Sequence, residues 1–302
     1  MLPVREIARC VQTGLRSLAL GANVSSLRFW SKPRKAYQYW NACLFLSNSM
    51  GEGSLKNKQV WEAFQDAPRD AKLHFPALQD SWIWHDPSYV ADLVHLGLLC
   101  QAVQPRTVFE IGTSTGYSSL FLAANTPPDT QIWTLDLPKQ ELLTQGSLTL
   151  HDRQIIEDCH KLEPCFVGHA LGKKIQRIYG DSAKFDFSPY RRSVDLFFVD
   201  GAHTYDYVRS DTINALRCCR PGGVIAWHDY RRSGLSRDVN KWLEQLNRIV
   251  AVYAAYGSSV AFMSCDFDCE ELAGRLGERE LGSSANRHAG EQAVTIPGGT
   301  AA

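Results

Sequence analysis

The sequence predicts an α/β fold in which a mostly parallel sheet carries helices on both faces. Between about residues 88 and 264, short β-rich runs alternate with stretches at helical spacing, an alternation typical of βαβ units. The β-rich runs are continuously apolar, as expected of strands buried on both sides. Polar residues follow these runs, at the sheet edge where ligands bind in such folds.

The expected elements follow from apolar periodicity and from the glycines and prolines between the runs. Strands are expected over residues 107–111, 131–136, 175–179, 194–199, 223–227, 248–256 and 259–263. Helices are expected over residues 89–103, 116–124, 205–219 and 236–246. The last two strands must run antiparallel, because Gly257 joins them tightly.

The chain divides into a partly helical N-terminal extension (1–85), a central domain (86–265) with an insert (137–172), and a C-terminal segment (266–302). Residues 1–35 combine basic residues with apolar residues at helical spacing, which predicts an amphipathic helix. This helix is expected to pack on the domain or on a second subunit, and in the second case the protein is a homo-oligomer. The alternative is a targeting or membrane-surface helix. Gly, Ala and Ser with few large apolar residues predict a disordered tail from about residue 281.

Composition disfavours several classes of protein. In 302 residues, 32 Lys and Arg balance 32 Asp and Glu, so no nucleic-acid partner is expected. No apolar run reaches the roughly 18 residues of a transmembrane span. The nine cysteines contain no C-x-x-C pair, which disfavours a zinc ribbon or a disulfide framework and favours a cytoplasmic protein.

The first motif, V-F-E-I-G-T-S-T-G-Y-S-S, occupies residues 108–119. It predicts a strand, a glycine-bearing turn and the start of a helix, and glycines allow the backbone to approach a ligand closely. The third glycine of the dinucleotide fingerprint is missing, which disfavours a nicotinamide-dependent oxidoreductase. A plain strand–turn–helix is the alternative.

Acidic residues follow the next two strands. Asp136 ends the second strand, where an acid can accept both hydroxyls of a ribose; alternatively it caps a helix. Gly180-Asp181-Ser182 follows the third strand and can read the amine of an adenine, or form a capped turn.

Two further motifs bring polar residues to the same edge. F-F-V-D-G-A-H-T-Y (197–205) places Asp200 directly after the most apolar strand and His203 shortly beyond it. R-P-G-G-V-I-A-W-H-D-Y (220–230) turns into a buried strand and then delivers His228 and Asp229.

Together, E-I-G-x-x-x-G-x-S, F-x-D-G-A-H-x-Y and P-G-G-V-x-x-W-H-D-Y resemble the O-methyltransferase-like group of class I S-adenosylmethionine-dependent methyltransferases. The resemblance spans about residues 88–264. It implies a Rossmann-like seven-stranded sheet in the order 3-2-1-4-5-7-6, with the last strand antiparallel. It also implies S-adenosylmethionine as cofactor, with the ribose at Asp136, the adenine at Asp181 and Ser182, and the sulfonium and acceptor at Asp200. The remaining cofactor residues that it implies are Glu110, Gly112, Thr113, Ser114, Gly116 and Ser118.

Methyl transfer to a hydroxyl is an in-line displacement that also releases a proton. His228 or His203, with Asp200 beside them, is a candidate general base. Alternatively, Asp200, Asp229 and His228 hold a divalent cation such as Mg²⁺ that lowers the pKa of the acceptor. Related metal-dependent O-methyltransferases have acids at these strand ends, but Tyr230 stands where they carry a further acid or Asn. Either histidine can instead be structural, His203 as a helix cap and His228 bonded to a backbone carbonyl.

The expected function is therefore O-methylation of a small-molecule or sugar hydroxyl. The alternative is a non-catalytic subunit or scaffold that binds S-adenosylmethionine. The insert over residues 137–172 is expected to be a lid or an acceptor-binding segment, since its Cys and His residues match no common zinc spacing.

Overall fold

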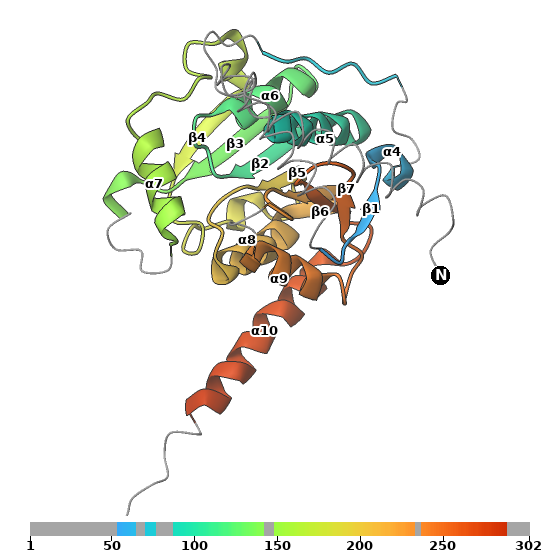
Figure 1. The fold of residues 1–302 in the computed structure, drawn as a ribbon, viewed down its shortest axis with the longest axis vertical. Coiled ribbons are helices and arrows are strands. Elements are labelled where there is room, and N and C mark those ends of the chain that lie inside the picture. The colour runs from blue at the N-terminus through green and yellow to red at the C-terminus, as the bar shows by residue number, and fades with distance from the viewer. Residues whose placement is uncertain (1–52, 65–69, 77–86, 142–147, 233–236, 289–302) are drawn as a thin grey trace, which may run out of the picture.

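A computed structural model describes residues 53–64, 70–76, 87–141, 148–232 and 237–288, and an eight-stranded sheet lies at its centre (Figure 1). The strands are β1 (Lys56–Lys58), β2 (Thr107–Ile111), β3 (Gln131–Asp136), β4 (Ile175–Tyr179), β5 (Val194–Val199), β6 (Cys219–Trp227), β7 (Tyr253–Ala255) and β8 (Ala261–Ser264). The α-helices are α4 (Val60–Ala63), α5 (Pro87–Val103), α6 (Tyr117–Asn125), α7 (Leu150–Cys159), α8 (Tyr205–Cys218), α9 (Arg237–Leu246) and α10 (Cys269–His288). Short 3₁₀ turns are η2 (Lys139–Glu141), η3 (Ala170–Lys174) and η4 (Ser188–Tyr190).

The strand order across the sheet is β4-β3-β2-β5-β6-β8-β7-β1. The parallel strands are β4, β3, β2, β5 and β6, whereas β8 is antiparallel to both of its neighbours, β6 and β7. With β2 counted as the first strand of the domain, this is the order 3-2-1-4-5-7-6, so the predicted Rossmann-like topology is confirmed.

The eighth strand, β1, comes from the N-terminal extension and pairs in parallel with β7. Its three residues, Lys-Asn-Lys, lack both the apolar character and the β-branching that mark a strand in a sequence. The strand forms because the backbone of β7 would otherwise be an open edge, so local pattern could not predict it. The amphipathic stretch expected within residues 1–35 lies outside the described residues.

Three strands differ from their predicted bounds, and the smallest difference is in the last, which was expected over residues 259–263 and is Ala261–Ser264. The strand expected over residues 248–256 is only Tyr253–Ala255, because the N–H groups of Arg248, Ile249 and Val250 donate to the carbonyls at the end of α9. Strand β6 begins earlier than expected, at Cys219. The Pro-Gly-Gly segment, expected as a turn, lies inside this strand. The register between β5 and β6 shifts there, because Val194 pairs with Cys219 but Leu196 pairs with Val224.

Helices cover both faces of the sheet (Figure 1). Helices α5 and α6 pack on one face, and α8, with α9 and α10 against it, packs on the other. Alternate residues of the central strands point to opposite layers: Val108 and Leu196 join the core under α5 and α6, whereas Phe109 and Phe197 join the core under α8. All four are fully buried, as the continuous apolar runs predicted.

Helix α10 extends away from the body of the domain (Figure 1). It continues to His288, so the prediction of a disordered tail from about residue 281 is wrong for residues 281–288. A shortage of large apolar residues disfavours burial, but it does not prevent a helix that begins at Cys269 from continuing through small and polar residues. Residues 289–302 lie outside the described part of the chain.

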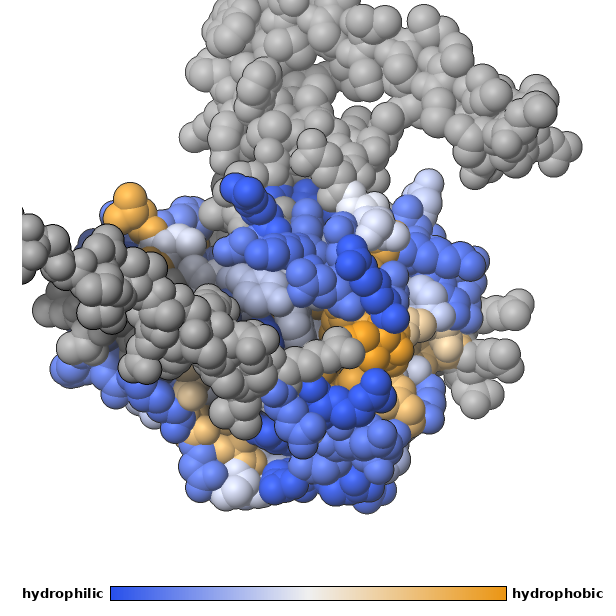
Figure 2. All heavy atoms as spheres, turned by 90° about the horizontal axis from the view of Figure 1, so that it is seen from below, coloured by the Kyte–Doolittle hydropathy of each residue, from blue (hydrophilic) through white to orange (hydrophobic). Residues whose placement is uncertain are grey.

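The described residues on the face of the molecule drawn in Figure 2 are largely hydrophilic. On the face in Figure 2, the hydrophobic residues drawn in colour form small patches between larger hydrophilic areas. Among the described residues, no helix combines the length and the apolar character needed to cross a membrane.

Candidate active site

A cavity of about 520 Å³ opens at the carboxyl ends of the parallel strands. Loops after β2, β3, β4, β5 and β6 line it on one side, and helix α7 of the insert lines it on the other. The predicted site residues that line it are Gly112, Thr113, Ser114, Ser118, Asp136, Asp181, Ser182, Asp200, His203, His228 and Asp229. The topology therefore brings together residues from five separate motifs of the sequence.

The loop after β2 requires glycine at its first position. Gly112 has a φ of 99°, and a Cβ there would overlap the backbone carbonyl of Asp200. Ser114, two residues on, also has a positive φ of 48°, a conformation that non-glycine residues adopt only when the surrounding structure holds it. The loop backbone therefore lies directly against the loop after β5, with no side chain between the two.

Two residues expected to contact a cofactor lie behind this loop. Glu110 is fully buried, and its Oε2 accepts hydrogen bonds from the hydroxyls of Ser119 and Thr134. Burial raises the pKa of Glu110 to about 7, although these hydroxyls lower it. A side chain at Gly116 would meet Phe166. Neither Glu110 nor Gly116 lines the cavity; both shape the loop from the protein side.

The acids after β3 and β4 differ in how they are held. Asp136 lines the cavity, and its Oδ2 lies 2.5 Å from Nη2 of Arg177. Oδ1 of Asp181 accepts hydrogen bonds from the Ala183 N–H and the Tyr207 hydroxyl, both at 3.0 Å. The other oxygen of Asp181 pairs with Lys184. The Asp181 carboxylate therefore stabilises its own turn, as the capped-turn alternative predicts.

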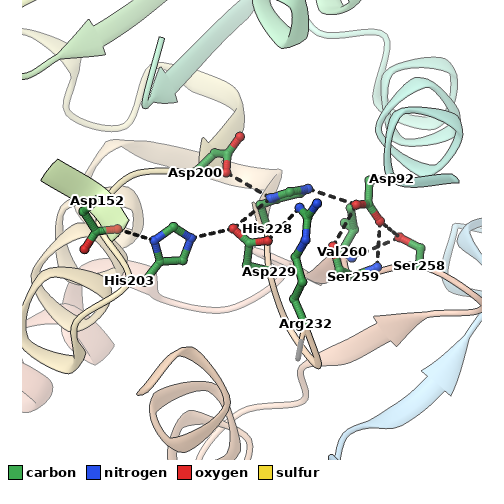
Figure 3. A network of polar contacts seen from close by, with 10 residues as sticks. All are labelled: Asp92, Asp152, Asp200, His203, His228, Asp229, Arg232, Ser258, Ser259 and Val260. Atoms are coloured by element: carbon green, nitrogen blue, oxygen red, sulfur yellow. Dashed lines mark hydrogen bonds and ion pairs between the residues drawn. The ribbon is translucent and has the colours of Figure 1, made fainter. Parts of the chain in front are cut away.

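At the other end of the cavity, alternating acids and histidines form a continuous chain (Figure 3). His203 lies between Asp152 and Asp229, with Nδ1 at 2.5 Å and Nε2 at 2.6 Å from their carboxylate oxygens. His228 continues the chain, with Nδ1 at 3.1 Å from Oδ2 of Asp229 and Nε2 at 3.0 Å from Oδ2 of Asp92. Helix α7, the loops after β5 and β6, and helix α5 are thus connected through one polar network.

His203 is held as a cation. Burial opposes the charged ring, but the hydrogen bonds to Asp152 and Asp229 outweigh it and raise the pKa of His203 to about 10. An imidazolium with both N–H groups engaged has no lone pair for a further proton, so this geometry does not support His203 as the general base. The N-cap of α8 is Thr204, so His203 is not the helix cap either.

His228 is also surrounded by carboxylates. The residue is 6% exposed, and Nδ1 lies 3.1 Å from both Asp200 Oδ1 and Asp229 Oδ2. Burial opposes the charged ring, but Asp200 and Asp229 raise the pKa of His228 well above its ordinary value. Despite this proximity, Nδ1 makes no hydrogen bond of good geometry within the described residues. His228 bonds Asp92 through Nε2 rather than a backbone carbonyl.

Asp200, His228 and Asp229 form a set of donors for a divalent cation. Each offers one ligand atom, and the three atoms lie within 4.8 Å of one another. The orphaned Nδ1 of His228 is one of the donors that the set can supply. Tyr230 takes no part, because its hydroxyl points toward strand β1 and accepts a hydrogen bond from the Leu55 N–H at 3.0 Å. The residues present therefore fit a cation held by two carboxylates and an imidazole.

Three residues of the network were not predicted from the sequence. Asp92 is a buried acid in the apolar helix α5 and accepts hydrogen bonds from Ser258 and Ser259; a charge in so apolar a helix signals a buried partner. Asp152 belongs to a capping box at the start of α7, a pattern that predicts the helix but not the contact with His203. Arg232 donates to Oδ1 of Asp229 at 3.0 Å.

Helix α7 of the insert forms part of the cavity wall. Helix α7 lines it with residues that include His151, Ile155 and Ile156. Its C-terminal end is attached to the strand loops by Cys159 Sγ, 3.1 Å from Ser114 Oγ, and by His160 Nε2, 2.8 Å from the Leu137 carbonyl.

Comparison with known proteins gives one family match. Residues 109–230 match the family model described as a methyltransferase domain. A search of curated proteins finds no match to the chain.

Solved structures similar to this chain include an O-methyltransferase from Bacillus cereus in complex with S-adenosylhomocysteine (19% identity, 63% of this chain and 83% of that chain, TM-score 0.38). The O-methyltransferase TomG from Streptomyces achromogenes, in complex with S-adenosylmethionine, has 19% identity over 75% of this chain and 96% of that chain, with a TM-score of 0.39. A methyltransferase from Geobacter sulfurreducens has 18% identity over 57% and 77%, with a TM-score of 0.38.

The matched stretch runs from strand β2 to the residue after Asp229 and contains all the strand-end motifs of the cavity. The strand order around it is the one that the resemblance implied. Residues 109–230 are therefore similar to a methyltransferase domain, set in a sheet of the predicted Rossmann-like topology.

Proposed function

We propose that this chain is an S-adenosylmethionine-dependent O-methyltransferase that acts on a small-molecule or sugar hydroxyl with the help of a divalent cation. The observation that carries the proposal is that one cavity is lined by the glycine loop after β2, by Asp136 and Ser182, and by the cluster of Asp200, His228 and Asp229.

The cavity suits the cofactor along its length. Gly112, Thr113 and Ser114 line the cavity, and the missing side chain at Gly112 lets this loop pack directly against the Asp200 loop, so that both loops border the space that the amino-acid part of the cofactor would occupy. Asp136 lies at the end of the next strand, where its carboxylate can accept from ribose hydroxyls. When bound, S-adenosylmethionine would supply a methyl group on a positively charged sulfur, and Asp200 would favour that charge.

The acceptor hydroxyl must lose a proton during transfer, and the geometry argues against a free histidine base. Both rings lie between carboxylates that raise their pKa, and both nitrogens of His203 are engaged by acids, so neither ring is arranged as a free base. A cation such as Mg²⁺ or Mn²⁺, held by Asp200, His228 and Asp229, would take the place of the proton on Nδ1 of His228 and would lower the pKa of a hydroxyl beside it. Asp92 would keep the His228 ring oriented through Nε2.

Transfer of a radiolabelled methyl group tests this function. The full chain is incubated with labelled S-adenosylmethionine and with phenols, catechols and sugars, in the presence of Mg²⁺ or Mn²⁺. Label is expected in an alkali-stable ether product of one acceptor class. A chelator, or Asp200→Asn, is expected to reduce the rate by about 100-fold or more, since the loss of charge stabilisation at a transition state has this magnitude.

Glu157→Gln is the matched control, because Glu157 is an exposed acid of helix α7 that does not line the cavity. Its rate is expected to equal that of the wild type. Binding of S-adenosylmethionine without transfer to any hydroxyl acceptor would instead favour the non-catalytic subunit that the sequence left as the alternative.

A further inference from the structure

Asp152 and His203 lie outside the donor set for the cation, yet they reach it through Asp229 (Figure 3). His203 places Nδ1 at 2.5 Å from Oδ1 of Asp152 and Nε2 at 2.6 Å from Oδ2 of Asp229. The three side chains are only 3%, 11% and 7% exposed. Because both ring nitrogens are engaged, His203 is arranged to hold its neighbours rather than to react.

Asp152 is itself fixed by the first turn of helix α7. Its Oδ2 accepts from the Thr149 N–H at 3.0 Å, while the Thr149 hydroxyl accepts from the Asp152 N–H at 3.0 Å. This reciprocal pair is a capping box, which sets the orientation of the carboxylate relative to the helix. Oδ1 is left to meet His203, so the position of the ring depends on where α7 lies.

Asp229 needs such support. It is a non-glycine residue with a φ of 61°, a conformation that persists only where the surroundings impose it. Arg232 holds Oδ1 at 3.0 Å, and His203 holds Oδ2. The same Oδ2 lies 3.1 Å from Nδ1 of His228, so the contact with His203 fixes the oxygen that faces the proposed cation ligands.

We propose that Asp152 and His203 are positioning residues, through which helix α7 of the insert orients Asp229 toward Asp200 and His228. The proposal rests on the cation site of the proposed function. Hydrogen-bond partners that orient metal ligands typically change metal affinity by about 10–100-fold when they are removed. Seating of α7 over the cavity and cation binding at the strand ends are then coupled, and each strengthens the other.

The test measures Mn²⁺ affinity by electron paramagnetic resonance, with the full chain saturated with S-adenosylhomocysteine. Asp152→Asn and His203→Gln are each expected to weaken Mn²⁺ binding by about 10–100-fold relative to the wild type. The double variant is expected to lose no more than His203→Gln alone, because both residues act along one path to Asp229. A merely structural role would lower the midpoint of urea unfolding and leave Mn²⁺ affinity unchanged.

One control variant separates positioning from other effects. Glu157→Gln removes an exposed acid from the same helix that does not line the cavity. It is expected to bind Mn²⁺ as the wild type does. Equal Mn²⁺ affinity in the wild type, Asp152→Asn and His203→Gln overturns the positioning role while leaving the proposed function standing. A wild type that binds S-adenosylhomocysteine but no Mn²⁺ overturns the cation site and this proposal together.

Discussion

His228 Nδ1 lies 3.1 Å from Oδ1 of Asp200, although the two residues follow different strands. Strands β5 and β6 are parallel neighbours, with Val199 opposite Trp227, so the next residue of each strand leaves the sheet at the same level. Asp92 holds the far side of the His228 ring. The register of two buried strands thus sets the spacing of the polar groups that we assign to chemistry.

Gly112→Ala is expected to abolish binding of S-adenosylhomocysteine and to lower the free energy of unfolding by about 3 kcal/mol or more, because it adds overpacking to the strain of a positive φ. Gly168→Ala is the control, since Gly168 has a φ of 77° but nothing within 4 Å of an added Cβ. That variant should lose only about 1 kcal/mol and keep its ligand affinity. Urea unfolding and calorimetry measure both quantities, and equal losses in the two variants would contradict the close-approach argument.

Asp136→Asn is expected to weaken S-adenosylhomocysteine binding by about tenfold or more, because a hydrogen bond to a charged acceptor contributes roughly 1.5–3 kcal/mol. Calorimetry with the wild type and the variant measures the change. Asp129→Asn, an exposed acid in the turn before β3, serves as the control and should bind normally. An Asp136→Asn protein with wild-type affinity would remove the ribose role from this residue.

Lys174→Met is expected to lower the free energy of unfolding by about 2–3 kcal/mol, because buried carbonyls would lose their donor. Lys174 Nζ lies 2.7 Å from the Ala123 carbonyl, 2.9 Å from Thr126 Oγ1 and 2.8 Å from the Pro127 carbonyl, and so closes the C-terminal end of α6. Lys173→Met changes an exposed neighbour and should alter stability by less than about 0.5 kcal/mol. Similar urea midpoints for the two variants would show that the cap contributes little.

Asp211→Asn is expected to stabilise the protein at neutral pH. Burial raises the pKa of Asp211 from its ordinary 3.8 to about 7, against the lowering effect of the Ser182 hydroxyl. Because the folded-state pKa is the higher one, the wild type loses stability as the pH rises from about 4 to about 7, by up to about 4 kcal/mol. Below this pH window Asp211 is protonated in both the folded and the unfolded state. Above the window, the loss of stability no longer changes with pH.

Urea unfolding between pH 4 and pH 8 measures this effect as the difference in stability between Asp211→Asn and the wild type. The difference should grow in favour of the variant across the window and then level off. Asp206 is an exposed acid of the same helix. The difference in stability between Asp206→Asn and the wild type should not grow in favour of the variant across this window. Parallel curves for Asp211→Asn and the wild type would contradict a raised pKa at this buried carboxyl.

Much of the fold was predictable because the central strands are buried on both faces. Four strands begin and end at the predicted residues, since each run stops at Gly or at an acid. Strand β1 was not predictable, because a Lys-Asn-Lys segment becomes a strand only through the free edge of β7.

The meeting of the strand-end residues at one sheet edge was predictable, but the acids that surround the two histidines were not. Motif order places Asp200, His228 and Asp229 at one sheet edge, as parallel topology requires. The roles of His203 and His228 depend on Asp152 and Asp92, which belong to helices distant in the sequence. Only the packing of those helices shows that each ring lies between acids, which raise the pKa of both histidines.

Calorimetric titration of the full chain with S-adenosylhomocysteine, with Mn²⁺ or with chelator, tests the central claim most directly. We expect micromolar binding in the cavity, and an affinity that increases when Mn²⁺ is present. No binding at millimolar ligand by a chain that unfolds cooperatively in urea would contradict the assignment of the cavity to this cofactor.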